Sequence, residues 1–454
     1  MLRDRGPLWI LTCYLVLVLA LPSRAIIGPL GTLGAPSTLL TVGILGLWVW
    51  ASVAGQTSSS ATIGRPVRRA AIALMIVALA VYAHAMTQPM PADEITPADG
   101  TLVRFLALVG LALMVSDGLS SREQVWTFVR RLTTGGGLIA LLAVFQAVTR
   151  QIWIDRIPIP GLTVEIPADA SLITRGLFSR PSGTASHPIE FGSVMAMVLP
   201  LALARARFAP RDDRVRAWLW VGAIGLAVMF SVSRTAIVCS LASVLVLAFA
   251  WSNRARALLP FAMLGGIAAV SVAVPGLVGT LRGMFTSSAD DPSVASRTES
   301  YTYAFDLIGR SPWLGRGQGT FLPRYRILDN GFLGMAIEAG VIGLGAFLAL
   351  LVVAVVSAHR ARVASLAPHD KELAQAIAAA VVAGSLAFAF YDQFAFPQAA
   401  GLLFLNIGLA GAVHRLAREE AAETPANPSA ILPATQALRR GTPAPSVTQE
   451  STGT

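Results

Sequence analysis

Long apolar runs separated by short polar segments dominate the chain. A membrane-spanning helix needs about 20 predominantly apolar residues. A spanning β-strand instead alternates apolar and polar residues over about ten positions. The runs here are continuous, so the pattern predicts an all-α integral membrane protein with about 12 transmembrane helices. The predicted spans are residues 8–27, 36–55, 70–87, 102–116, 125–148, 189–206, 217–232, 235–251, 257–275, 331–357, 373–391 and 397–414.

The first run resembles a secretory signal, because Arg3 and Arg5 precede it. It lacks a small-x-small cleavage site and further spans follow, so we interpret it as a first membrane helix.

Composition agrees with a membrane location. The 454 residues are 54% hydrophobic and 13% charged, whereas soluble domains carry about 25% charged residues. The net charge of +10 comes almost entirely from arginine, since Lys371 is the only lysine. Most arginines fall in short loops between spans, so membrane orientation explains them and no nucleic-acid partner is expected.

The arginine distribution predicts the topology. Cytoplasmic loops of multi-pass proteins are enriched in Lys and Arg. An even number of spans with both termini in the cytoplasm places most of the basic clusters inside and the acidic segment with Asp93, Glu94 and Asp99 outside. The inner clusters are Arg65, Arg68 and Arg69; Arg205, Arg207, Arg211, Arg214 and Arg216; Arg254 and Arg256; and Arg360, Arg362 and Lys371.

Two long segments then face outward and still keep arginines. The predicted divisions are N-terminal helices 1–148, a first extracytoplasmic loop 149–188, central helices 189–275, a large extracytoplasmic loop 276–330 between the ninth and tenth spans, C-terminal helices 331–414 and a disordered cytoplasmic tail 415–454. No internal repeat is visible.

The large loop is predicted to contain a short helix. Ser296 and Glu299 have capping-box spacing, and the helix should end near Gly309, before Ser311-Pro312. Its apolar face would be formed by Tyr301, Ala304, Phe305 and Ile308.

Cationic side chains near this helix are candidates for binding an anion. Arg297 lies in its first turn, where a cation opposes the helix dipole. A bound phosphate or a carboxylate partner would account for that placement, although an arginine exposed at the lipid surface is the alternative. In the turn 315–319, glycines would let backbone N–H groups approach an anion beside Arg316; the alternative is a simple connector. Gly340, Gly343 and Gly345 are expected to allow close helix packing.

Three further polar residues lie where spans begin. His187 could serve as a general base, although a lone loop histidine is commonly structural. Glu190 suits a helix N-terminus. Arg234 lies between two spans with almost no loop, so it should be paired, line a polar cavity or reach the interface. Cys13 and Cys239 lie in apolar segments and are interpreted as small apolar residues without a disulfide or a metal cluster.

Together these motifs resemble the O-antigen ligase/polymerase superfamily of bacterial envelope enzymes. The resemblance covers residues 175–345, and the order and spacing of the matching segments fit together. The matching segments are Arg180-Pro-Ser-Gly, Ser231-Val-Ser-Arg234, the helix led by Arg297, Ser311-Pro-Trp-Leu-Gly-Arg-Gly-Gln-Gly-Thr-Phe321, Asp329-Asn-Gly-Phe-Leu333 and Glu338-Ala-Gly-Val-Ile-Gly343.

The resemblance implies a metal-independent glycosyltransferase of the bacterial inner membrane without a cofactor. Its site would lie on the periplasmic or extracellular face. It would pass a glycan from an undecaprenyl-diphosphate carrier to an acceptor glycan, beside other polysaccharide-assembly proteins. By position, Arg180, Arg234 and Arg297 would hold the diphosphate, with Arg316 as a further candidate.

One departure bears on the reaction. Ligases of this family usually have a histidine before the Asn of the tenth-span motif, where this chain has Asp329. Asp329 is therefore the first candidate base and His187 the second, and Asn330 and Glu338 are assigned to the acceptor or to structure. Aspartate also occurs at this position in polymerase-like members, which favours polymerisation over ligation.

Aromatic residues of the large loop could stack on sugar rings, or they could serve helix packing instead. They are Tyr301, Tyr303, Trp313, Phe321 and Tyr325.

Two other classes of function remain open. A transporter or flippase for lipid-linked glycan would show repeat symmetry and ionisable residues at the membrane midplane. A non-catalytic scaffold would leave the outer arginines unexplained.

Overall fold

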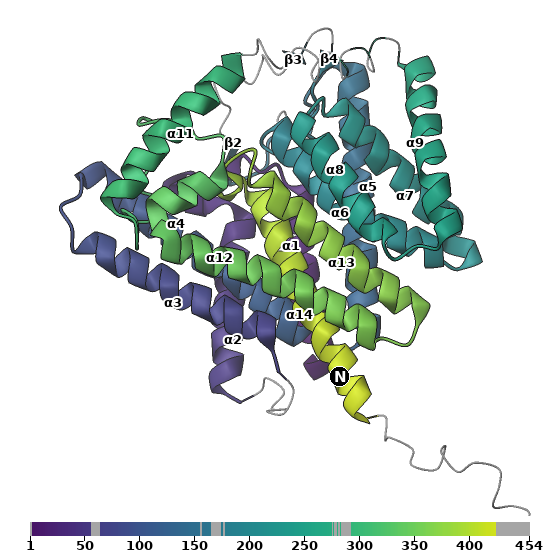
Figure 1. Ribbon diagram of the computed structural model, residues 1–454, viewed down its shortest axis with the longest axis horizontal. Coiled ribbons are helices and arrows are strands. Elements are labelled where there is room, and N and C mark those ends of the chain that lie inside the picture. The colour runs from purple at the N-terminus through teal and green to yellow at the C-terminus, as the bar shows by residue number, and fades with distance from the viewer. Residues whose placement is uncertain are drawn as a thin grey trace, which may run out of the picture.

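The computed structural model describes residues 2–55, 64–154, 157–164, 174–175, 178–274, 276, 279, 282 and 292–423. Within these residues, thirteen α-helices form the molecule (Figure 1). They are α1 (Leu2–Ala20), α2 (Pro36–Val53), α3 (Pro66–Met86), α4 (Ala92–Gly118), α5 (Arg122–Thr149), α6 (Pro188–Phe208), α7 (Arg211–Phe230), α8 (Arg234–Ala248), α9 (Asn253–Ala273), α11 (Pro292–Arg310), α12 (Gly331–Ala364), α13 (Pro368–Ala387) and α14 (Pro397–Glu423).

The remaining elements are short. The 3-10 helices η1 (Gly28–Gly34) and η5 (Gln393–Ala395) lie in connections between α-helices. Strands β1 (Ala25–Ile26) and β2 (Thr163–Val164) pair antiparallel, with Ala25 opposite Val164. Strands β3 (Thr174–Arg175) and β4 (Phe178–Ser179) form a second antiparallel pair.

Each of the twelve predicted apolar segments coincides with one of these helices, and α11 is the additional short helix of the large loop. Seven helices among the described residues are long and apolar enough to cross a membrane: α2, α3, α4, α5, α6, α12 and α14. The helical fold is therefore confirmed and is compatible with an integral membrane protein, and twelve membrane crossings with the large loop between the ninth and tenth stay a prediction.

The loops that connect the helices contact one another in two groups, one at each end of the bundle. At one end, interhelical ion pairs join predicted cytoplasmic segments, as between Arg205 and Asp213 at 2.9 Å and between Arg207 and Glu372 at 2.9 Å. At the other end, predicted outer segments meet, and the N–H of Ser23 donates to the carbonyl oxygen of Thr184 at 2.8 Å. This grouping agrees with helices that alternate in direction along the chain.

The centre of the bundle is formed by α6, α13 and α14. The most apolar window of α14 is 100% buried inside the protein and that of α6 is 89% buried, against 17% for α2. In Figure 1, α14 runs through the middle of the bundle, while α9 lies at its edge. The peripheral helices therefore present apolar side chains outward, as lipid-facing helices do.

Helix α12 is interrupted at Gly340, whose φ of 63° and ψ of −171° are not helical. Beyond the break, the N–H groups of Val341 and Ile342 donate to the carbonyl oxygens of Pro312 and Trp313, at 2.8 and 3.2 Å. Before the break, the carbonyl oxygens of Ile337 and Glu338 accept from the N–H groups of Arg316 and Gly317, at 3.1 and 2.8 Å. The segment 312–317 thus satisfies backbone groups that the break leaves without helical partners.

This contact explains two glycines better than helix packing does. A Cβ on Gly340 would lie 2.3 Å from the carbonyl oxygen of Trp313, and one on Gly315 would lie 2.4 Å from that of Glu338. Gly340 therefore admits a loop backbone, not a neighbouring helix. Nothing lies within 4 Å of the corresponding position on Gly345, so the expected close packing there is wrong.

Several predicted boundaries are corrected. The loop helix α11 begins at Pro292, so Ser296 lies inside it and not at its predicted start; proline is favoured at the first helical position. Helix α4 begins at Ala92, so Asp93 and Glu94 lie in its first turn. Helix α14 continues to Glu423, so residues 415–423 are helical instead of starting the tail. The rest of the predicted tail lies outside the described residues.

The interruption of α12 predicts different responses from two glycines of one helix. Gly340→Ala should lower the free energy of unfolding by more than about 3 kcal/mol, because its Cβ meets backbone atoms and φ is positive. Gly345→Ala should be neutral or stabilising by up to about 1 kcal/mol. Thermal unfolding of the detergent-solubilised protein measures both, and equal melting temperatures for the two variants would contradict this account.

Candidate functional site

Two of the predicted diphosphate-binding arginines lie at the connection between α7 and α8, at the end of the bundle where the predicted outer segments meet. The Nε–H of Arg180 donates to the carbonyl oxygen of Ser231 at 3.1 Å, and Arg234 follows at the first position of α8. These residues are far apart in sequence, and the connection between α7 and α8 brings them together.

That connection is strained. Val232 has a φ of 44°, which is unusual for a β-branched residue, and its side chain is fully buried. Such a conformation costs about 1–3 kcal/mol and is maintained only where surrounding packing enforces it. The Ser233 hydroxyl caps α8 by accepting from the N–H of Ala236 at 3.4 Å. The tight turn therefore fixes Arg234 at a helix N-terminus, where the dipole also favours an anion.

His187 caps the N-terminus of α6. Its Nδ1 accepts from the N–H of Ile189 at 3.1 Å, so the neutral ring carries its proton on Nε2. Burial, followed by the positive charges of Arg180 and Arg24, lowers the pKa of His187 to about 4. The imidazole is therefore neutral near pH 7, a weak base, and placed to donate a hydrogen bond from Nε2.

Arg24 joins this group, although the sequence reasoning did not select it. It lies just after α1, is 7% exposed and donates to the carbonyl oxygen of Ser186. Its position at the end of the first apolar run was the available signal. We call Arg24, Arg180, His187 and Arg234 the cationic cluster.

Glu190 organises the backbone beside this cluster, which confirms its predicted place at a helix N-terminus. One carboxylate oxygen accepts from the N–H and hydroxyl of Ser186, at 2.8 and 2.7 Å. The other accepts from the N–H of Gln398 at 2.8 Å, in the first turn of α14. A fully buried carboxylate thus joins the loop before α6 to the start of α14.

The turn between α13 and α14 connects the cationic cluster to the start of α12. The Phe396 ring lies 6.3 Å from the His187 ring and 5.3 Å from that of Tyr391. On its other side, the N–H of Gly331 donates to the carbonyl oxygen of Phe388 at 2.8 Å. The residues immediately before α12 therefore border the same turn as His187 does.

Asp329 and Asn330 occupy that position. Asn330 caps α12 through its side-chain oxygen, which accepts from the N–H groups of Phe332 and Leu333 at 3.0 and 3.2 Å. Asn330 is thus used structurally. The preceding Asp329 is exposed, so its carboxylate is accessible from the outer end of the bundle.

Asp392 is a second accessible carboxylate, and the sequence reasoning did not select it. It is exposed, yet burial raises its pKa, against the opposing effects of the Phe394 and Ala395 amides and of Arg104. The polar triplet Tyr391-Asp392-Gln393 between two apolar runs was the signal that could have found it.

Arg316 lies apart from the cationic cluster. One of its terminal nitrogens is 2.9 Å from both carboxylate oxygens of Glu94, which is 1% exposed. Tyr325 and Arg324 also contact Glu94, and Tyr325 stacks on Phe321 with ring centroids 5.9 Å apart. The amides expected to approach an anion, those of Arg316 and Gly317, donate instead to α12. This geometry fits a buried structural ion pair.

Glu338 and Arg297 complete the predicted set. Glu338 accepts from the N–H of Phe321 at 3.1 Å and so holds the loop that carries Arg316. Helix α11 places the backbone of Arg297 in the large loop, and its side chain lies outside the described residues. The helix packs on α12 through a cluster containing Ala304, Leu328 and Ile337.

A family model described as O-antigen ligase matches residues 219–348. The matched region extends from α7 to α12 and contains Arg234, Arg297, Arg316, Asp329, Asn330 and Glu338. A comparison with curated proteins found no match.

Substitutions in the Arg316–Glu94 pair test whether Arg316 stabilises the fold or binds a ligand. Arg316→Met should lower the free energy of unfolding by about 3 kcal/mol, because it leaves a buried carboxylate without its main partner. Adding Glu94→Gln should recover most of that loss. The control Arg310→Met removes a side chain that is 71% exposed and should cost less than about 1 kcal/mol. Unchanged thermal unfolding in Arg316→Met would contradict the structural interpretation.

The cap formed by His187 predicts a pH-dependent stability. The unfolded ring titrates near its ordinary pKa of 6.5 and the folded ring near 4, so the unfolded state binds more protons between these values. The stability contribution is complete above about pH 6.5 and is lost as the pH falls towards about 4. His187→Asn keeps a capping oxygen but should reduce the fall in melting temperature between about pH 7 and about pH 5.

His359→Asn is the control, because this exposed histidine of α12 should leave the wild-type pH dependence unchanged. Identical pH profiles for wild type and His187→Asn would contradict the assignment.

The matched region contains the turn that fixes Arg234 and the entrance to α12. The O-antigen ligase family model therefore confirms, over residues 219–348, the predicted resemblance to the O-antigen ligase/polymerase superfamily.

Proposed function

We propose that this protein transfers a glycan from an undecaprenyl-diphosphate carrier to an acceptor sugar and thereby polymerises a cell-surface or secreted polysaccharide. The observation that carries the proposal is that Arg180 donates to the carbonyl oxygen of Ser231, three residues before Arg234 at the N-terminus of α8. The O-antigen ligase family match adds glycosyl transfer as the class of reaction.

The cationic cluster suits the diphosphate of the donor. In the reaction, the acceptor hydroxyl oxygen forms a bond to the anomeric carbon, and the bond from that carbon to the diphosphate oxygen breaks. Negative charge then develops on the departing diphosphate. Guanidinium groups and helix N-termini stabilise such charge, so the proposed transfer uses arginines in place of a metal ion.

The acceptor hydroxyl must lose its proton as the new bond forms. Asp329 is the proposed base, since its carboxylate is accessible at the start of α12. Asp392 is a second carboxylate at the same end of the bundle. The neutral His187 instead donates a hydrogen bond from Nε2 to a donor oxygen, a role that follows from its low pKa and its cap.

Ligation to a lipid or protein acceptor is the nearest alternative, since the family match covers ligases by its description. The aspartate at position 329 favours polymerisation.

Transport of lipid-linked glycan is the alternative from another class. Interrupted helices are typical of transporters, and α12 is interrupted at Gly340. The backbone of residues 312–317 forms hydrogen bonds with the groups that this interruption leaves unpaired. This favours a fixed structural contact over a substrate site on a transport pathway.

The activity test uses the purified protein in vesicles with a lipid-linked oligosaccharide. Wild type should form longer glycans, and Arg297→Ala should lower the rate by about 100-fold or more. Arg310→Ala is the matched control: it removes an arginine of the same helix that is paired with Asp306, and it should retain activity. Movement of the substrate without formation of a glycosidic bond would overturn the proposal.

A further inference from the structure

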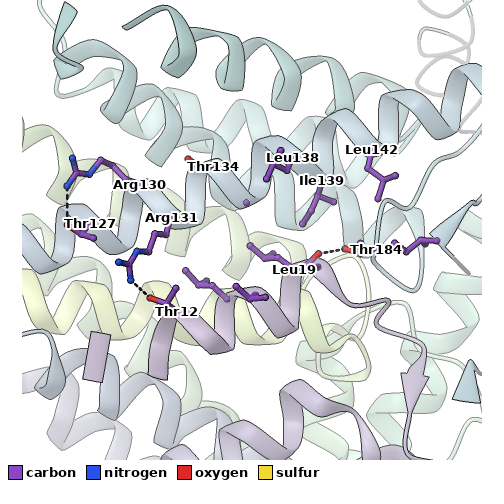
Figure 2. A pocket seen from close by; sticks show the side chains of 15 residues that line it. Thr12, Leu19, Thr127, Arg130, Arg131, Thr134, Leu138, Ile139, Leu142 and Thr184 are labelled. Atoms are coloured by element: carbon purple, nitrogen blue, oxygen red, sulfur yellow. Dashed lines mark hydrogen bonds between the residues drawn. The ribbon is translucent and has the colours of Figure 1, made fainter. Parts of the chain in front are cut away.

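A groove of about 680 Å³ lies between α1 and α5, away from the proposed site for glycan transfer. Its length is lined by apolar side chains such as Leu15, Val16, Leu138 and Leu142. In Figure 2, Arg130, Arg131, Thr12 and Thr127 gather at one end of the groove, and Leu19 and Thr184 lie at the other.

Two arginines form the charged end of the groove. Arg130 and Arg131 are exposed and contact only hydroxyl groups: Arg131 donates to Thr12, and Arg130 donates to Thr127 at 3.0 Å. Among the described residues, neither arginine has a carboxylate partner. Several other arginines on this predicted side are paired with acids: Arg65 and Arg68 with Asp117, Arg122 with Asp370, Arg205 with Asp213 and Arg207 with Glu372.

We propose that this groove binds an anionic phospholipid of the cytoplasmic leaflet, with one acyl chain along α1 and α5 and its phosphate on Arg130 and Arg131. An arginine fork pairs well with phosphate oxygens, and basic pockets between membrane helices on the cytoplasmic side bind anionic headgroups. Neighbouring apolar residues Val16 and Leu138 are each 56% exposed, so the groove opens sideways to lipid. The leaflet assignment rests on the proposed topology and not on the proposed reaction.

The position of the arginines at one end of the groove favours an anionic phospholipid over the polyprenyl carrier as the bound lipid. In the proposed function, the diphosphate of the carrier binds to the cationic cluster, which lies beyond the Thr184 end of the groove. A carrier chain lying in the groove would place only its hydrocarbon tail beside Arg130 and Arg131. A phospholipid entering from the opposite leaflet places its charge at two guanidinium groups that have no carboxylate partner among the residues that the structure describes.

The experiment is native mass spectrometry of the delipidated full-length protein with added phosphatidylglycerol or phosphatidylcholine of identical acyl chains. Wild type should retain phosphatidylglycerol over phosphatidylcholine by roughly tenfold. Arg130→Gln with Arg131→Gln should remove the preference. Leu138→Trp fills the groove and should lower retention of both lipids, which keeps the test decisive if the arginine pair variant fails to fold.

The matched control is Arg211→Gln with Arg214→Gln, which removes two exposed arginines of the same predicted side and should keep the preference. An equal effect of this control, or no preference in wild type, would overturn the proposal. Preferential retention of a polyprenyl phosphate, undiminished in the Arg130 and Arg131 pair variant, would assign the groove to the carrier and also overturn it. No glycan is present, so this outcome is independent of the transfer assay.

Discussion

In a membrane, every backbone N–H and C=O group must find a partner within the protein, and this constraint explains the architecture around Gly340. The break frees carbonyl and N–H groups in α12, a helix that is long and apolar enough to cross a membrane. Residues 312–317 supply the missing partners through four backbone hydrogen bonds to residues 337, 338, 341 and 342. The large loop is therefore attached to the helix bundle through its main chain.

That attachment positions the outer site. The docked segment continues into residues whose side chains reach α4, where Arg316 and Tyr325 contact the buried Glu94. It then leads to Asn330, which caps α12 and places Asp329 at the outer end. The accessible carboxylate thus follows from an interrupted helix, an ion pair and a cap, each of which fixes one part of the loop. A rigid support of this kind is what positioned catalytic groups require.

The helices could be predicted because apolar runs carry the information directly, and all twelve runs are helices. The site was only partly predictable. Arg180 and Arg234 were selected from sequence, but their meeting depends on the positive φ of Val232, which no local pattern indicates. Arg316 was selected for its glycines and charge, yet its partner Glu94 is more than two hundred residues away. Long-range ion pairs leave no periodic signal, so they had to come from the structure.

His187 shows how environment changes the chemistry of a predicted residue. From sequence, a loop histidine suggests a base that titrates near neutral pH. Here Nδ1 is occupied as a helix cap, and burial with two nearby arginines holds the ring neutral. The same cations that would attract a diphosphate therefore prevent this histidine from accepting a proton. If the cluster binds a diphosphate as proposed, the base must be another residue, and this agrees with the proposal of Asp329 for that role.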